Sequence, residues 1–102
     1  MPFNGKEGSQ ITKQLGATMT AAYRSKFPNE IKAHFFGKDI LNTILSQNGC
    51  EGIRFYQGVN SNGDLELVIV GADANENDLL NFVGDLSIPC PNECDNNNSP
   101  LL

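Results

Sequence analysis

The sequence predicts a small α+β domain with two N-terminal helices, a β-hairpin and one short C-terminal helix before an extended tail. Apolar residues recur every three or four positions in the first half of the chain, which is the period of an amphipathic helix. The period changes to two in "GIRFYQGV" and "LELVIVGA", and a helical spacing then returns. A chain of 102 residues suffices for one domain, so we expect a flexible lead over 1–8, a single domain over 9–88 and a Cys/Pro/Asn tail over 89–102.

The first helix is expected over residues 9–27. Ser9 has the side chain of an N-cap, and Pro28 marks the end because the residue before a proline disfavours the helical conformation. One face of this helix is apolar and is expected to pack in the core: Ile11, Leu15, Met19, Ala22, Tyr23 and Phe27.

The second helix is expected over residues 30–47, with Asn29 as its cap and Gly49 just past its end. Gly37 interrupts the pattern, so a kink is expected there, with Asp39 suited to cap a fresh segment.

The two alternating segments predict a β-hairpin joined by the turn-rich loop "NSNGD". The alternation gives each strand two faces: Ile53, Phe55 and Gln57 against Arg54 and Tyr56, then Leu65, Leu67 and Ile69 against Glu66, Val68 and Val70. A two-stranded hairpin is barely stable alone in water, so this one requires a third strand, a packed helix or a partner.

The segment "DANENDLLNFVGDL" predicts the short third helix, capped by Asn75 and ended by Gly84, with its apolar side chains turned inward. The segment "LSIP" that follows fits a short third strand. The proline-bracketed "IPCPNEC" is expected to lie as an extended strap over the domain or over a neighbouring molecule.

The net charge of −5 is unevenly distributed along the chain. Residues 1–38 carry six basic and two acidic side chains, whereas residues 39–102 carry ten acidic side chains and Arg54 alone. Opposed patches of this kind attract each other within one molecule or between copies. The acidic total and the scattered basic residues argue against nucleic acid as a partner. Without an apolar run of membrane-spanning length or a signal peptide, a cytoplasmic location with reduced thiols and no membrane contact is expected.

The only candidate metal ligands are weak ones: Cys50, Cys90, Cys94 and His34. Their types suit zinc, but a single C-x3-C pair is not specific, and burial of Cys50 and His34 as packing residues is the plainer interpretation. In an exported protein, a disulfide between Cys90 and Cys94, or from Cys50 to either, becomes the leading interpretation. "DANEND" begins like a calcium loop but lacks the required glycine and glutamate, and helix capping accounts for it.

Neither a catalytic nor a cofactor-binding motif occurs in the sequence, so we expect a protein that is not an enzyme and holds no cofactor. The segments "NGCEGIRFYQG", "LELVIVGADANENDLL" and "IPCPNEC" resemble a group of small uncharacterised bacterial proteins with a G-C-x-G-I-R strand and a Cys-Pro tail. The resemblance covers residues 34–94 and implies no activity, cofactor or partner.

Self-association is the function that these features favour, from a homodimer up to a filament subunit. The hairpin edge and the opposed charges are expected to form the interface, with Arg54, Tyr56, Val68 and Val70 at the contact. Two alternatives stay open. One is a monomeric adaptor or inhibitor that presents acidic side chains to a basic protein: Asp64, Glu66, Asp73, Glu76 and Asp78. The other is a zinc-binding or thiol-dependent protein.

Overall fold

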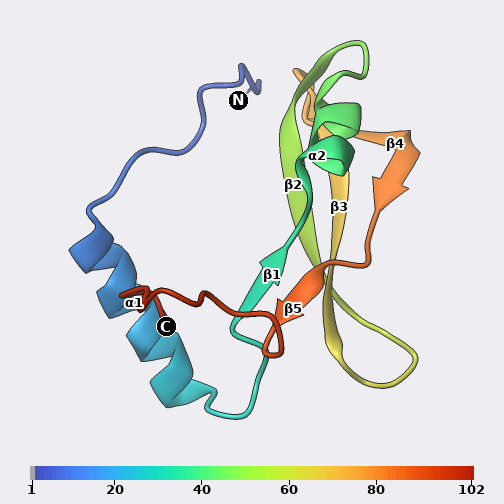
Figure 1. The fold of residues 1–102 in the computed structure, drawn as a ribbon. Helices are drawn as coiled ribbons and strands as arrows, with labels where there is room; N and C mark the ends of the chain where they lie inside the picture. Colours follow the sequence, from blue (N-terminus) through green and yellow to red (C-terminus); the bar gives the residue numbers. More distant parts are fainter. Residues whose placement is uncertain (1) are drawn as a thin grey trace. The chain divides into compact units, whose positions relative to one another are not determined.

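A computed structural model describes residues 2–102 and confirms the α+β class, with two helices and five strands in two antiparallel sheets (Figure 1). The elements are α1 (Lys13–Lys26), β1 (Ala33–Phe35), α2 (Lys38–Leu45), β2 (Cys50–Val59), β3 (Leu65–Asp73), β4 (Asp78–Gly84) and β5 (Ile88–Cys90). The small domain consists of two compact units. The sheet unit holds the described residues up to Glu7 and residues 36–87, and the disulfide unit holds residues 8–35 and 88–102.

The sheet unit is a three-stranded antiparallel sheet in the order β2-β3-β4, with α2 packed on one face. Ile44 of α2 and Ile69 of β3 are fully buried in this core. The helix approaches the sheet closely because glycines lie beneath it: a Cβ at Gly71 would lie 3.2 Å from the Cγ2 of Ile44, and one at Gly84 would lie 2.7 Å from the Cδ1 of Ile40. A larger side chain at either position would therefore push α2 or its neighbours away.

The predicted hairpin is confirmed, with β2 and β3 joined by residues 60–64. The side-chain oxygen of Asn60 accepts the N–H groups of Asn62 and Asp64, at 2.9 and 3.0 Å. Gly63 takes a positive φ of 83°, a conformation that glycine adopts without steric cost. The loop chemistry therefore matches what the sequence "NSNGD" predicts.

The predicted C-terminal helix is wrong, because its residues form the strand β4. The carboxylate of Asp73 accepts the N–H groups of Asn75 and Asn77, at 2.9 and 3.0 Å, and so closes a turn between β3 and β4. In β4 the pairing shifts between Leu79 and Val83, which leaves three residues outside the ladder. The paired residues on either side of this bulge, Leu79 and Val83, are four positions apart in the sequence, which is also the spacing along one face of a helix. β4 thus supplies the third strand that the hairpin requires.

The predicted second helix divides into β1 and the shorter α2. Gly37, in an extended conformation, is the N-cap of α2, so neither Asn29 nor Asp39 caps it. His34 consequently lies in a strand and not in a helix. The residues before Gly37 leave the helix because β1 pairs with β5, a partner more than 50 positions later in the sequence.

In the disulfide unit, α1 begins later than predicted, because Thr12 and not Ser9 accepts the N-cap hydrogen bond, from Leu15 at 3.1 Å. The expectation that its apolar face is core is wrong. Leu15 and Met19 are about half exposed, and no residue of the helix is buried. The short strand predicted at "LSIP" exists as β5, but it pairs with β1 in a sheet of its own (Figure 1).

Candidate functional site

The outer edge of β2 forms one border of the sheet in the sheet unit. β2 spans ten residues and pairs only with β3, so it borders the sheet. Its register shifts between Cys50 and Gly52 and is regular from Gly52 to Val59, whereas β4 at the opposite border is interrupted in its middle by a bulge. Three apolar or aromatic side chains on β2 are exposed: Phe55 by 52%, Tyr56 by 44% and Val59 by 66%. A long, regular and apolar edge strand is a template for pairing with another strand.

The hydrogen-bond alternation identifies which backbone groups of β2 face outward. The N–H of Asn60 donates to the carbonyl of Asp64 at 2.9 Å, which makes these two residues a hydrogen-bonded pair. Hydrogen-bonded pairs recur at every second position of an antiparallel ladder. The next ones are therefore Gly58 with Glu66, Tyr56 with Val68 and Arg54 with Val70. The residues between them direct their N–H and C=O groups away from β3: Ile53, Phe55, Gln57 and Val59. Within residues 2–102, no backbone–backbone hydrogen bond outside the sheet ladders uses residues 53–59.

The four residues predicted at the interface lie together on one face of the hairpin. Arg54 stands opposite Val70, and Tyr56 stands opposite Val68. Val70 is only 2% exposed and Val68 is partly buried, whereas Tyr56 is exposed. Their role at an interface stays a prediction. Tyr56 is the most exposed of the four, and the Arg54 side chain is 31% exposed.

Arg54 joins β2 to the β3–β4 loop. Its Nη1 donates to the carboxylate of Asp78 and, at 3.3 Å, to the carbonyl of Glu76, while its guanidinium lies 5.4 Å from the centre of the Phe3 ring. The hydroxyl of Tyr56 donates to the other carboxylate oxygen of Asp78 at 2.6 Å. We call Phe3, Arg54, Tyr56 and Asp78 the Arg54 cluster. It holds in place a loop in which Glu76 has a positive φ of 69°.

The Arg54 cluster shifts the pKa values of its members. The hydrogen bond from Tyr56, with further support from Arg54, lowers the pKa of the Asp78 carboxyl. The same carboxylate raises the pKa of Tyr56 and that of Arg54 through its hydrogen bonds. The three groups thus stabilise one charge state, with Asp78 ionised and Tyr56 and Arg54 protonated. The ion pair between Arg54 and Asp78 therefore fixes the start of β4 against β2.

The acidic residues of the adaptor alternative are largely used within the chain. Asp73 accepts two N–H groups of its own loop, and Asp78 belongs to the Arg54 cluster. One oxygen of Glu66 accepts from Asn60 at 3.4 Å, and the other is buried with no hydrogen-bond partner among residues 2–102. These contacts leave less free acidic surface for a basic protein than the sequence suggests.

The four candidate metal ligands Cys50, Cys90, Cys94 and His34 do not form one cluster in the described residues. Cys90 and Cys94 form a disulfide, Cys50 is a free thiol that donates to the carbonyl of Gly52 at 3.2 Å, and His34 lies in β1. Across residues 2–102, no three His, Cys, Asp or Glu side chains are grouped as a metal site requires. The expectation of reduced thiols is therefore wrong for Cys90 and Cys94, and their disulfide is one of the pairings expected for an exported protein.

A cavity of about 320 Å³ adjoins the Arg54 cluster in the sheet unit. Its lining combines the N-terminal segment with the start of β2: Phe3, Gly5, Glu7, Glu51, Gly52, Ile53, Arg54 and Ala72. The sequence alone did not indicate Phe3 or Glu7, because nothing local to the first seven residues shows that they pack beside Arg54.

No family model, curated protein or solved structure matches this chain. The resemblance to small bacterial proteins therefore stays a prediction. In the part of the chain that the structure describes, no helix combines the length and apolar character that a membrane crossing requires.

Proposed function

We propose that the protein is a non-enzymatic assembly protein that associates with copies of itself through the outer edge of β2. The observation that carries the proposal is the ten-residue edge strand with Phe55 and Val59 exposed on it. Pairing with a second β2 satisfies the outward backbone groups and removes apolar side chains from water.

An antiparallel register centred on Phe55 suits this strand best. It places Phe55 opposite the same residue of the second copy, in a pair whose backbone groups both face the edge. It also places Arg54 opposite Tyr56 of the other copy. A register centred on Arg54 would instead oppose two like charges, which destabilises a strand pair. The result is a six-stranded sheet with two-fold symmetry.

Charge gives this proposal a distinctive salt dependence. The described residues of the sheet unit contain three basic and nine acidic side chains, so two such units repel each other. Salt screens repulsion between exposed charges, and added salt should therefore strengthen edge pairing. A head-to-tail assembly driven by opposed charge patches should weaken in the same titration.

Sedimentation velocity over a range of protein concentrations tests the proposal. Phe55→Lys should dissociate the assembly, because it places a charge in the centre of the new sheet. Gln57→Pro should do the same, because the N–H that it removes faces the edge and contributes no bond to β3. Leu80→Lys is the matched control, since Leu80 is 73% exposed on β4 and lies outside the β2 edge.

The expected result is a concentration-dependent oligomer for the unmodified protein and for Leu80→Lys, with monomers for both β2 variants. Far-UV circular dichroism checks that the variants are folded. A protein that is monomeric at every concentration, or an oligomer that survives Phe55→Lys, would refute the edge as the site of association.

A further inference from the structure

The chain contains three Asn-Gly pairs, at residues 4–5, 48–49 and 62–63. In each pair the glycine has a positive φ, of 83°, 79° and 83°. An asparagine before glycine has a particular reactivity, because the backbone nitrogen of the glycine can attack the asparagine side-chain carbonyl with no Cβ in the way. The reaction expels ammonia and closes a five-membered succinimide ring. What surrounds the two reacting atoms decides how readily this occurs.

Around Asn4, hydrogen bonds engage both reacting groups. The side-chain carbonyl oxygen of Asn4 accepts the backbone N–H of Lys6 at 2.9 Å. The N–H of Gly5, which is the nucleophile, donates to a carboxylate oxygen of Glu7 at 3.0 Å. The second oxygen of Glu7 accepts the N–H of Asn4 at 3.0 Å, so the carboxylate is fixed at two points.

The Asn62–Gly63 pair offers a comparison within the same chain. The N–H of Gly63 donates to the carbonyl oxygen of Asn60 at 3.0 Å, in the turn of the hairpin loop. A neutral carbonyl cannot take a proton at ordinary pH, whereas a carboxylate can. The same nucleophile is therefore held by a base at Gly5 and by a non-basic acceptor at Gly63.

We propose that Asn4–Gly5 is a self-modification site, at which the surrounding groups promote conversion of the asparagine to aspartate or isoaspartate. Glu7 accepts the proton of the Gly5 N–H as the nitrogen bonds to the Cγ of Asn4. The Lys6 N–H donates to the oxygen on which negative charge develops, as oxyanion-hole donors do. The Cγ–Nδ2 bond then breaks, and the nitrogen leaves as ammonia with the proton from Glu7. Water opens the ring at either carbonyl, so the sum of the steps exchanges an amide for an acid.

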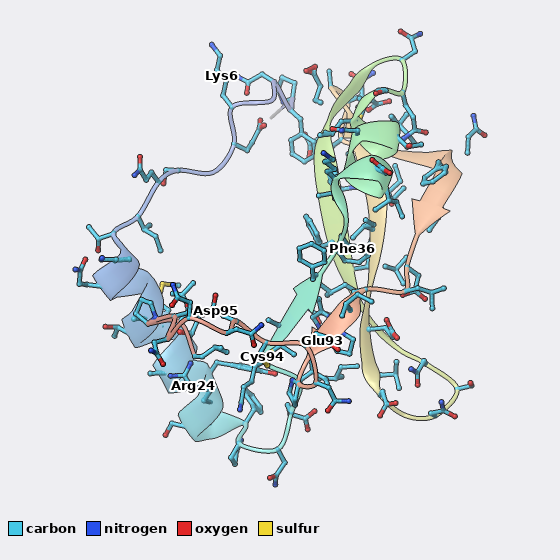
Figure 2. All side chains as sticks on the ribbon, in the orientation of Figure 1. Lys6, Arg24, Phe36, Glu93, Cys94 and Asp95 are labelled. Carbon is cyan, nitrogen blue, oxygen red and sulfur yellow. A yellow bond between two sulfur atoms is a disulfide. The ribbon has the colours of Figure 1, made fainter. Side chains whose placement is uncertain are left out.

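The local environment supplies what these steps require. Residues 4–7 are all exposed, so water reaches the ring, and the side chain of Lys6 extends away from the segment (Figure 2). Backbone hydrogen bonds, first that from Asn4, lower the pKa of Glu7, so its carboxylate is ionised at neutral pH although it is a weaker base than an ordinary glutamate.

The modification has a consequence for the sheet unit. Phe3, the residue before the site, lies against Arg54 and donates its N–H to the carbonyl of Ala74 at 3.0 Å. An aspartate at position 4 adds a negative charge beside Glu7, and an isoaspartate lengthens the backbone by one methylene. Either change weakens the contact of the N-terminal segment with the β3–β4 loop.

The test follows deamidation of the full chain at each asparagine by peptide mapping and mass spectrometry during incubation at neutral pH. Asn4 should be lost faster than Asn62 by on the order of tenfold or more, the size expected of a positioned base and an oxyanion donor. Glu7→Gln removes the base, and Lys6→Pro removes the backbone donor, so each should slow the loss of Asn4 towards the rate of Asn62.

Lys6→Ala is the matched control, because it keeps the backbone N–H and should leave the rate at Asn4 unchanged. The rate at Asn62 should stay constant in all three variants. An Asn4 that is lost no faster than Asn62, or a rate at Asn4 that neither Glu7→Gln nor Lys6→Pro lowers, would overturn the proposal.

Discussion

Replacing Gly71 by alanine should destabilise the sheet unit, because side chains from α2, from β2 and from the residues between them occupy the space that a Cβ would need. The new carbon would lie 2.8 Å from the Sγ of Cys50, 3.0 Å from the Nε2 of Gln47 and 3.2 Å from the Cγ2 of Ile44. Ile44 is fully buried, and Gln47 donates to the carbonyl of Ile44 at 3.0 Å, so neither neighbour moves without loss.

The size of the effect follows from two opposing contributions. Overpacking a core costs about 1–3 kcal/mol. Replacement of glycine by alanine also restricts the unfolded chain, which returns about 0.4–1 kcal/mol where the backbone tolerates the change. The free energy of unfolding should therefore fall by about 1–2 kcal/mol.

Gly58→Ala is the matched control in the neighbouring strand. A Cβ there would meet the carbonyl of Glu66 and the Cγ2 of Val68, both at 3.6 Å, which is ordinary van der Waals contact. This variant should gain about 0.5 kcal/mol, since only the restriction of the unfolded chain remains. Urea unfolding followed by circular dichroism, at one protein concentration for all variants, compares the two midpoints.

A double variant isolates the cause. Cys50→Ala removes the sulfur that the new carbon would approach most closely, so it should recover part of the stability lost in Gly71→Ala. A midpoint for Gly71→Ala at or above that of Gly58→Ala would refute the close packing around Gly71.

Two further predictions concern the disulfide and the Arg54 cluster. Replacing both Cys90 and Cys94 by serine should destabilise the disulfide unit by about 2 kcal/mol, the chain-entropy value for so short a loop. Amide hydrogen exchange in β1 and β5 should be faster in this variant than in the unmodified protein, while β2 and β3 keep their protection. Exchange rates in β1 and β5 equal to those of the unmodified protein would contradict this. The hydrogen bond from Tyr56 lowers the pKa of Asp78 in the folded state, so ionised Asp78 stabilises the fold. This stabilisation is complete well above pH 3.8, the ordinary pKa of the carboxyl, and is lost as the pH falls below 3.8. Asp78→Asn should flatten this acid-side loss in urea titrations, and an unchanged pH dependence would count against the contribution of Asp78.

The hairpin was predictable because its signals are local. Alternation of apolar and polar residues sets the two faces of β2 and β3, and "NSNGD" carries its own turn chemistry. The alternation set the two faces of each strand, and the strand register then places Arg54 and Tyr56 on one face with Val68 and Val70.

The strands that were missed depend on distant partners. β1 forms only because β5 pairs with it, and no feature of residues 33–35 announces that partner. In β4 the bulge places apolar residues at helical spacing, so the period of the sequence and the structure disagree. The Arg54 cluster was not predicted for a similar reason. Phe3 lies far before Arg54 in the sequence and Asp78 far after it, and only the fold brings them together.

The disulfide also determines how the chain responds to a cut in its backbone. Cys90 and Cys94 enclose Pro91, Asn92 and Glu93 in a small covalent ring. A protease that cleaved within this ring would open a loop without releasing a fragment, because the sulfur bridge still joins the two pieces. The segment after the cut would also stay bound to α1, because Arg24 donates a hydrogen bond to the carbonyl of Leu101 at 2.7 Å. Separation of the C-terminal residues after such a cut therefore requires a reductant as well as a protease.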